Sequence, residues 1–306
     1  MAASLILIMK INAEKYIYTL SLGGIYLRLY SEIPLTISED TADFVVDDRK
    51  MDAAVHVKLQ TCAFSLPEEE CGRDLLMKYY RKDNLYYAAG RTEAVGDCSV
   101  TIYTPDFSVA DFYINEEKYP GMIRKISKVL QLLPIRQFLS NYQAMLLHSS
   151  CVAVEEKALI FTAPSQTGKT TQARLWEQYG HARRVSNDRS LLRKQGNCFD
   201  VYGYPVDGSS PVCSNQRVTL GAVVVLRQGR ENQVERLRVS KALKYLMEQT
   251  VADVWNAEEL GILRQLWMEL LEVYPVYLLT CRPDHEAVQC LKNQLKKDGV
   301  ISIGDN

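Results

Sequence analysis

The sequence predicts an α/β protein with a strand-rich α+β domain over residues 1–140 and a second domain over residues 141–306. The first observation behind this prediction is that short Tyr- and Val-rich segments, separated by turn residues, fill the chain up to about residue 115. The second is that, from about residue 144 onward, apolar segments of strand length alternate with segments of helical spacing. Near-continuous apolar strands are typical of an α/β sheet that helices cover on both faces.

In the first domain, Gly, Pro and Asp turn residues separate the expected strands. These strands lie at residues 16–20, 25–30, 53–59, 85–89, 99–103 and 110–114. A helix is expected over residues 121–133. The apolar residues that return there at helical spacing are Met122, Ile126, Val129, Leu130 and Leu133. Because Pro134 ends this helix or starts another, we expect the domain boundary between about residues 115 and 145.

In the second domain, apolar segments predict buried strands and capping residues mark the helix ends. The strands are expected at residues 144–147, 151–154, 158–162, 184–186, 201–204, 218–226 and 275–279. The helices are expected at residues 169–179, 240–250, 257–271 and from 285 to about 297. Gly180 stops the first of these helices, Asn256 opens the third and Asp284 caps the last.

The composition is that of a globular protein without a strongly charged surface. Of the 306 residues, 47% are hydrophobic and 24% are charged, and the formal net charge is −1. This balance argues against binding to nucleic acid or to an anionic membrane, and the basic stretch at residues 78–82 is expected to be a solvated face. The apolar run near the N-terminus is too short to span a bilayer and lacks a signal-peptide cleavage site. Eight cysteines without a Cys-x-x-Cys pair predict reduced thiols, so we expect a soluble, cytoplasmic protein.

A phosphate-binding loop is predicted between a buried strand and the start of a helix. The residues expected to bind phosphate are Ala163, Pro164, Ser165, Gln166, Thr167, Gly168, Lys169, Thr170 and Thr171. Backbone N–H groups at a helix start, together with the helix dipole, favour a bound phosphate. Lys169 adds a positive charge at the β- and γ-phosphates, and the hydroxyl of Thr170 can ligate Mg²⁺. The motif therefore predicts ATP and Mg²⁺ as the cofactors.

The loop departs at two positions from the usual pattern Gly-x-x-x-x-Gly-Lys-Ser/Thr. Ala163 stands where the first glycine is expected, and Gln166 occupies a place that glycine often holds. A side chain at either position can restrict the backbone torsions or the approach of a phosphate. The alternative interpretation is a strand–turn–helix junction in which Gly168 is a turn residue and Lys169 is a surface charge.

Three segments, in this order, resemble the kinase domain of the HPr kinase/phosphorylase family and its phosphoenolpyruvate carboxykinase relatives. They are residues 147–150 (Leu-His-Ser-Ser), which end a strand, the loop at 163–171, and residues 180–188, where the family has a strand that ends in an Asp-Asp pair. The resemblance is best over residues 146–228. It implies a P-loop kinase core for the second domain.

The resemblance also implies roles for residues outside the loop. His148 would lie beside the phosphate and metal site, and Asp188 would hold Mg²⁺ together with Thr170 or accept the proton of the acceptor hydroxyl. Asn187 stands where the family usually has the other aspartate, and an amide cannot act as a base at neutral pH. The alternatives are a core histidine for His148 and a turn or helix-cap residue for Asp188.

The remaining histidines are expected to have structural roles, whereas two charged residues further along the chain have two possible roles. His181 follows a helix end, where it fits a capping role, and His56 and His285 are expected to be structural. By the resemblance, Asp207 or Arg217 would contact the acceptor or the transferring phosphate, with a solvated loop charge as the alternative for each.

The leading hypothesis is a kinase that transfers the γ-phosphoryl group of ATP to a serine-type hydroxyl of a protein, peptide or small metabolite. Asp188, His148 and Lys169 are the expected catalytic residues, and Thr170 and Asp188 are the expected metal ligands. The alternatives are a nucleotide-binding regulatory protein with little catalysis and phosphoenolpyruvate carboxykinase-type chemistry. Neither nucleic acid nor a membrane is an expected partner, and a homo-oligomer remains open.

Overall fold

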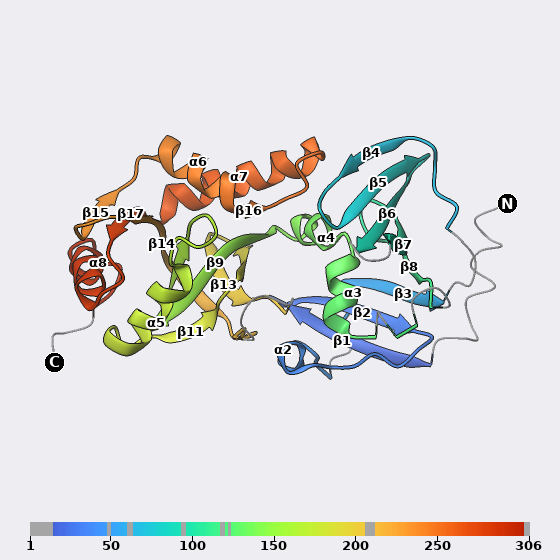
Figure 1. Cartoon of the computed structure of the whole chain (residues 1–306), viewed down its shortest axis with the longest axis horizontal. Coiled ribbons are helices and arrows are strands. Elements are labelled where there is room, and N and C mark those ends of the chain that lie inside the picture. The colour runs from blue at the N-terminus through green and yellow to red at the C-terminus, as the bar shows by residue number, and fades with distance from the viewer. Residues whose placement is uncertain are drawn as a thin grey trace. The chain divides into compact units, whose positions relative to one another are not determined.

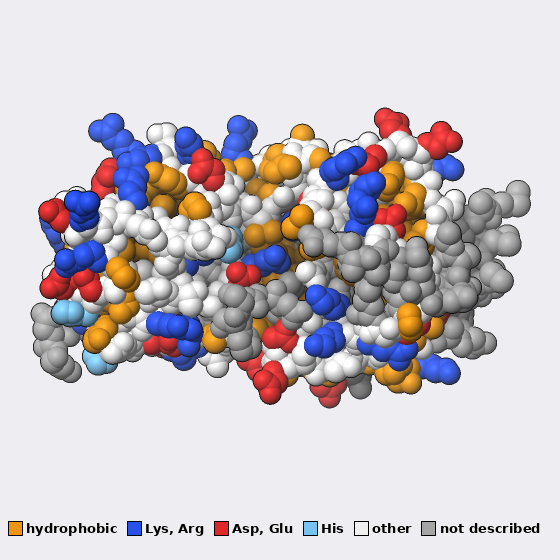
Figure 2. Space-filling model, in the orientation of Figure 1, with side chains coloured by type: hydrophobic (Ala, Val, Ile, Leu, Met, Phe, Trp, Pro, Cys, Tyr) orange, Lys and Arg blue, Asp and Glu red, His pale blue; other side chains and the backbone are white. Residues whose placement is uncertain are grey.

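The structure is a computed structural model that describes residues 15–47, 50–59, 64–92, 96–116, 120–121, 124–205 and 212–302. The chain divides into two compact units, with the division after Phe138 (Figure 1). Each unit contains a large sheet with helices, so the protein has a mixed α/β fold. On the face shown in Figure 2, acidic and basic side chains are interspersed, in keeping with the near-neutral composition.

The sheet of the first unit, within the described residues, has the strand order β1-β2-β3-β8-β7-β6-β5-β4. Its strands are β1 (Tyr16–Leu22), β2 (Ile25–Ser31), β3 (Ala53–Leu59), β4 (Glu70–Arg73), β5 (Met77–Lys82), β6 (Leu85–Thr92), β7 (Gly96–Tyr103) and β8 (Ala110–Ile114). The short helices are α2 (Glu39–Ala42), α3 (Ile126–Leu132) and α4 (Ile135–Asn141). β2 and β3 pair in parallel, as do β3 and β8, and the other neighbours are antiparallel.

All six strands that the sequence predicted in this unit are confirmed, but β4 and β5 were missed. In β5, Met77 and Tyr79 are buried and alternate with more exposed side chains, so the prediction of a solvated face for residues 78–82 is wrong for Tyr79. The predicted helix over 121–133 is too long, because Lys125 still has extended backbone angles and α3 begins only at Ile126. Of the expected helical residues, Met122 lies outside the described part of the chain.

The described sheet of the second unit has the order β10-β9-β12-β13-β14-β17-β15, and β10 also pairs with β14. Its strands are β9 (Ala144–Val154), β10 (Lys157–Thr162), β11 (Arg183–Ser186), β12 (Arg189–Gln195), β13 (Cys198–Gly203), β14 (Val218–Gln228), β15 (Gln233–Arg236), β16 (Thr250–Val251) and β17 (Val276–Cys281). The helices are α5 (Lys169–Tyr179), α6 (Val239–Gln249), α7 (Ala257–Val273) and α8 (His285–Lys297). β10, β14 and β17 are neighbours with parallel pairing, so their carboxyl ends meet at one edge of the sheet.

Helices cover both faces of this sheet, as the apolar strands predicted. Ile160 and Val223 belong to a buried cluster that includes Trp267 of α7 and Leu246 of α6. Their chain neighbours, such as Phe161, belong to a second buried cluster. That second cluster includes Val224, Trp176 of α5 and Leu291 of α8. Because successive side chains of a strand point to opposite faces, the two clusters lie on opposite sides of the sheet.

The prediction that residues 147–150 end a strand is wrong, because they lie within β9. The predicted segments 144–147 and 151–154 are parts of one strand that continues through His148. The polar residues at its centre are tolerated because they are hydrogen-bonded: the Ser149 hydroxyl donates to the Leu147 carbonyl, and the Ser150 hydroxyl donates to Asn187. The sequence analysis also missed β12, β15 and β16.

The predicted helix ends of this unit are largely confirmed. α5 covers the predicted residues 169–179, and the side chains of Asn256 and Asp284 accept hydrogen bonds from backbone N–H groups in the first turns of α7 and α8. Gly180 ends α5, but the residue in the left-handed region is His181, with φ 54°. The N–H groups of Gly180 and Ala182 both donate to the carbonyl of Trp176, so this turn closes the helix.

Gly180 is required for a close approach rather than for its backbone angles. A Cβ atom at this position would lie 2.5 Å from Cε3 of Trp176 and 2.9 Å from its carbonyl oxygen, and the backbone oxygen cannot move without unwinding α5. We therefore expect Gly180→Ala to lower the free energy of unfolding by about 2 kcal/mol, the usual cost of overpacking. Gly261→Ala is the matched control, because a Cβ there meets open space within α7.

The control is expected to raise the free energy of unfolding by up to about 1 kcal/mol, because alanine is the better helix former. Urea unfolding followed by circular dichroism measures both changes. Equal and small effects of the two substitutions would contradict the packing assigned to Gly180.

Two further properties concern the described residues. No helix among them is both long enough and apolar enough to cross a bilayer. The seven cysteines that the structure describes are all free, and Cys62 lies outside the described ranges.

Candidate functional site

The predicted phosphate-binding loop connects the carboxyl end of β10 to the start of α5. Two of its residues have left-handed backbone angles, Gln166 with φ 64° and Gly168 with φ 113°. The first hydrogen bond within α5 runs from the Gln172 N–H to the Gly168 carbonyl over 2.9 Å. The N–H groups of the three preceding residues, 169–171, therefore point out of the N-terminus of the helix, where they can bind an anion.

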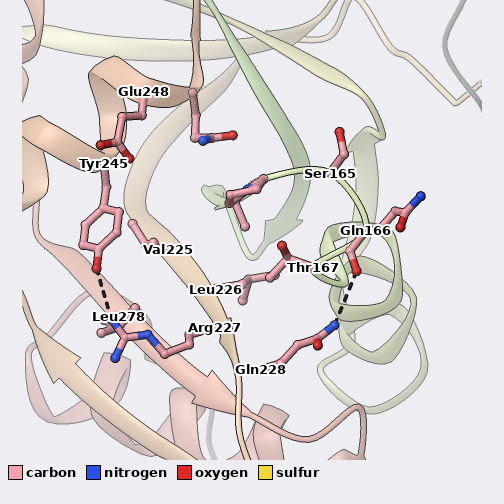
Figure 3. A pocket seen from close by; sticks show the side chains of 13 residues that line it. Ser165, Gln166, Thr167, Val225, Leu226, Arg227, Gln228, Tyr245, Glu248 and Leu278 are labelled. Carbon is pink, nitrogen blue, oxygen red and sulfur yellow. Dashed lines mark hydrogen bonds between the residues drawn. The ribbon is translucent and has the colours of Figure 1, made fainter.

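The two departures from the usual loop pattern are accommodated in different ways. The side chain of Ala163 is buried in the same apolar cluster as Phe161 and Trp176, so it points away from the loop surface. Gln166 adopts the left-handed conformation in spite of its side chain, and its carbonyl accepts a hydrogen bond of 3.3 Å from Nε2 of Gln228 (Figure 3). This bond ties the loop to the end of the neighbouring strand β14.

A cavity of about 340 Å³ lies between the loop and the two polar segments that the sequence analysis singled out. It is lined by His148, Ser165, Gln166, Gly168, Lys169, Thr170, Thr171, Asn187 and Asp188. The fold thus brings together six of the nine predicted loop residues with the histidine and the aspartate. Ala163, Pro164 and Thr167 do not line this cavity but border a second one, described below.

The backbone holds His148 and Asp188 beside each other. His148 lies in β9 and Asp188 follows β11, and the N–H of Ser149 donates to the Asp188 carbonyl over 3.1 Å. The imidazole Nδ1 lies 3.7 Å from a carboxylate oxygen of Asp188, and Nε2 has no hydrogen-bond partner among the described residues. Burial and the positive charge of Lys169 lower the pKa of His148 below its ordinary value of 6.5, although Asp188 opposes them. His148 is therefore neutral at pH 7.

Lys169 lies in the first turn of α5 with its side chain largely buried. Its ammonium group donates hydrogen bonds to the carbonyls of Ala163, over 2.8 Å, and Pro164, over 3.2 Å. Burial lowers the pKa of Lys169, and the negative charge of Asp188 opposes this shift. The ammonium group thus lies inside the loop, with the carboxylate of Asp188 as the acidic group that borders the same cavity.

The electrostatic coupling between Lys169 and His148 is directly testable. In Lys169→Met, which keeps the length of the side chain but removes the charge, we expect the pKa of His148 to rise toward 6.5. Burial, the largest cause of the shift, remains in this variant, so the pKa should stay below 6.5. Titration of the imidazole by NMR measures this pKa, and Lys241→Met, which removes an exposed lysine of α6, is the control that should leave it unchanged. An unchanged His148 pKa in Lys169→Met would contradict the coupling.

Thr170 and Asp188 offer one hydroxyl and one carboxylate oxygen to the same cavity. No group of three or more His, Cys, Asp or Glu side chains with metal-site geometry occurs within the described ranges. Mg²⁺ is commonly held by one or two protein oxygens together with the phosphates of a substrate. The residues present therefore fit a Mg²⁺ ion that arrives with a nucleotide.

Arg217 and Asp207 are the two residues that the resemblance placed near the acceptor. Arg217 does not line the cavity. Its side chain is 60% exposed, in agreement with the alternative of a solvated charge, and its Nε lies 2.9 Å from a carboxylate oxygen of the fully buried Asp200. The pair with Asp200 adds a structural role, because it neutralises a buried charge. Asp207 lies outside the described residues.

A second cavity, of about 510 Å³, lies on the other side of the loop, at the carboxyl ends of β10, β14 and β17 (Figure 3). It is lined by Ala163, Pro164, Ser165, Gln166, Thr167, Val225, Leu226, Arg227, Gln228, Tyr245, Glu248, Gln249 and Leu278. The guanidinium of Arg227 donates to the hydroxyl of Tyr245 over 3.1 Å across this space. Since Ser165 and Gln166 line both cavities, a single ligand that follows the loop can enter both.

The residues of α6 and of the end of β14 that border the second cavity were not predicted from the sequence. Tyr245 lies in an amphipathic helix and Gln228 lies at the end of an apolar strand. Nothing in the sequence around either residue therefore indicates a binding site. Only the carboxyl-edge rule for parallel sheets would have pointed to Gln228, given the strand order.

No protein-family model matches the chain, and no curated protein matches it in sequence. The solved structures that match include the HPr(Ser) kinase/phosphatase from Coxiella burnetii, with a TM-score of 0.30 and 10% sequence identity. That match covers 50% of this chain and 98% of the other chain.

Proposed function

We propose that the protein is a kinase that binds ATP with Mg²⁺ and transfers the γ-phosphoryl group to a serine-type hydroxyl of a protein, peptide or small metabolite. The observation that carries the proposal is that four groups border one cavity. They are Lys169, the N-terminus of α5, His148 and Asp188. A phosphate-binding loop with an acid and a base beside it is what phosphoryl transfer requires.

In this proposal the loop residues bind the triphosphate by complementary charge. The N–H groups at the start of α5 and the ammonium of Lys169 are donors to phosphate oxygens. For this role the Lys169 ammonium exchanges its present acceptors, the carbonyls of Ala163 and Pro164, for those oxygens. Thr170 and Asp188 hold Mg²⁺, which when bound neutralises charge on the phosphates.

The transfer step forms a bond between the acceptor oxygen and the γ-phosphorus and breaks the bond from that phosphorus to the bridging oxygen of ADP. The electron pair of the broken bond leaves with ADP, and the proton of the acceptor hydroxyl passes to His148 or Asp188. His148 suits this role because its lowered pKa keeps it unprotonated at pH 7. Asp188, at 3.7 Å, stabilises the imidazolium that forms.

The alternative of a nucleotide-binding regulator is supported by one observation. Asp188 is the sole carboxylate among the described residues that line the cavity, and Asn187 cannot accept a proton at neutral pH. If His148 does not act as a base, the site binds a nucleotide without transferring its phosphate.

The experiment that separates the two functions uses ATP labelled at the γ-phosphate with a panel of serine-containing peptides, proteins and hydroxyl-bearing metabolites. The kinase proposal predicts transfer of label to a member of the panel and release of ADP. Binding of Mg·ATP with no transfer to any acceptor would favour the regulator, and absence of binding would overturn both.

A further inference from the structure

The side-chain amide of Asn187 has two ends with different surroundings. Asn187 lies in the turn between β11 and β12, is 4% exposed and borders the cavity at the loop. Its Oδ1 accepts a hydrogen bond of 3.2 Å from the hydroxyl of Ser150 in β9. Its Nδ2 has no hydrogen-bond partner in the part of the chain that the structure describes.

A buried amide donor without a partner is uncommon in folded proteins, because burial removes its hydrogen bonds to water and nothing replaces them. In the contact with Asn187, the hydroxyl of Ser150 is the donor. Since Oδ1 is engaged by a donor, the end that lacks a partner is the N–H₂ group. This N–H₂ group is therefore available to an acceptor that enters the cavity.

The surroundings of Asn187 indicate which acceptor this is. The same cavity is bordered by the ammonium group of Lys169 and by the N-terminus of α5, both of which attract negative charge. An anionic oxygen is the ligand atom that all three donors can share. Asn187 adjoins Asp188, one of the two residues to which the proposed function gives the acceptor's proton, so the phosphate nearest to it is the terminal one.

We propose that Asn187 donates a hydrogen bond through Nδ2 to an oxygen of the terminal phosphoryl group of the bound nucleotide. This inference rests on the proposed function and adds a residue that recognises the group to be transferred. Ser150 is a positioning residue that holds the amide in the donating orientation. An amide here adds a donor, and it also avoids the repulsion that a second carboxylate would exert on the phosphoryl oxygens.

The proposal predicts a selective loss of affinity for ATP over ADP. We expect Asn187→Ala to weaken the binding of Mg·ATP about tenfold, the effect of losing one hydrogen bond to a charged group, and to leave the binding of Mg·ADP within about twofold. Asn187→Asp should weaken Mg·ATP further, and Ser150→Ala, which retains the amide, should give a smaller loss of the same kind. Titration calorimetry measures the affinities, and thermal unfolding checks that each variant is folded.

Asn197→Asp is the matched control, because Asn197 lies exposed in the turn between β12 and β13. It should change neither affinity. Equal losses for ATP and ADP in Asn187→Ala would reduce Asn187 to a structural role, and tighter binding or faster transfer in Asn187→Asp would mean that the site needs a second acid. Either result overturns the assignment.

Lys169→Met separates this inference from the proposed function. If Lys169→Met weakens the binding of both nucleotides while the Asn187 variants bind both as tightly as the wild type, the phosphate-binding loop is supported and the role of Asn187 is wrong. If the wild-type protein binds no Mg·ATP, the kinase proposal and the role of Asn187 fall together.

Discussion

Lys169→Met is expected to lower the rate of phosphoryl transfer by at least about 10²-fold, the effect of removing one preorganised donor to developing charge. The reason is that the ammonium of Lys169 lies inside the loop, at the N-terminus of α5, and is the cation that borders the cavity beside Asp188. Its loss should also weaken the binding of Mg·ATP by about tenfold or more. Transfer of γ-label and calorimetric titration measure the two effects.

The matched control is Lys241→Met, which removes a lysine from the exposed surface of α6 and should leave both quantities unchanged. Because Lys169 also donates to the carbonyls of Ala163 and Pro164, the unfolding temperature of the variant must be compared with that of the wild type. A folded Lys169→Met variant that transfers label at the wild-type rate would place the chemistry elsewhere in the molecule.

Asp188→Asn is expected to reduce transfer by about 10²- to 10⁴-fold, the range associated with loss of general acid–base assistance. The substitution removes a metal ligand and also removes the negative charge 3.7 Å from His148. Since that charge raises the pKa of His148, the variant should have a still lower His148 pKa, which NMR titration detects. The Mg²⁺ concentration needed for half-maximal activity should rise at the same time.

Glu156→Gln is the matched control, because it also removes a carboxylate but lies exposed between β9 and β10, outside the cavity; it should leave the Mg²⁺ dependence unaltered. If Asp188→Asn retained both the rate and the Mg²⁺ dependence of the wild type, Asp188 would be a turn residue, as one interpretation of the sequence allows.

The lowered pKa of His148 also has a consequence for stability. Its pKa is lower in the folded protein than in the unfolded chain, so the unfolded chain takes up the proton first on acidification. The contribution of His148 to the free energy of unfolding is therefore fully present above the ordinary pKa of 6.5 and is lost as the pH falls from there through the folded pKa, which urea unfolding at pH 7 and at lower pH measures against His148→Gln.

Much of the second unit could be predicted from its sequence because local signals and tertiary packing agree there. The loop motif and Gly180 gave the bounds of α5, and the side chains of Asn256 and Asp284 cap their helices as expected. The elements that were missed have weak local signals. β12 carries charged residues at Arg193 and Lys194 and is identified as a strand only by its pairing with β9 and β13.

The chemical groups of the candidate site could be named from the sequence, but the distances and hydrogen bonds between them could not. The loop motif indicated Lys169, and the family resemblance implied His148 and Asp188. The 3.7 Å separation of the histidine and aspartate depends on pairing between β9 and the segment around β11. The unpaired Nδ2 of Asn187 is visible only when its contact with Ser150 is known. Hydrogen bonds between residues far apart in the chain leave no pattern in a single sequence.

The most direct test of the account is a crystal structure of the protein with Mg²⁺ and a non-hydrolysable ATP analogue. We expect the β- and γ-phosphates to lie at the N-terminus of α5, with the ammonium of Lys169 moved from the carbonyls of Ala163 and Pro164 to the phosphate oxygens. A nucleotide bound at another place, with Lys169 still donating to those two carbonyls, would contradict the account.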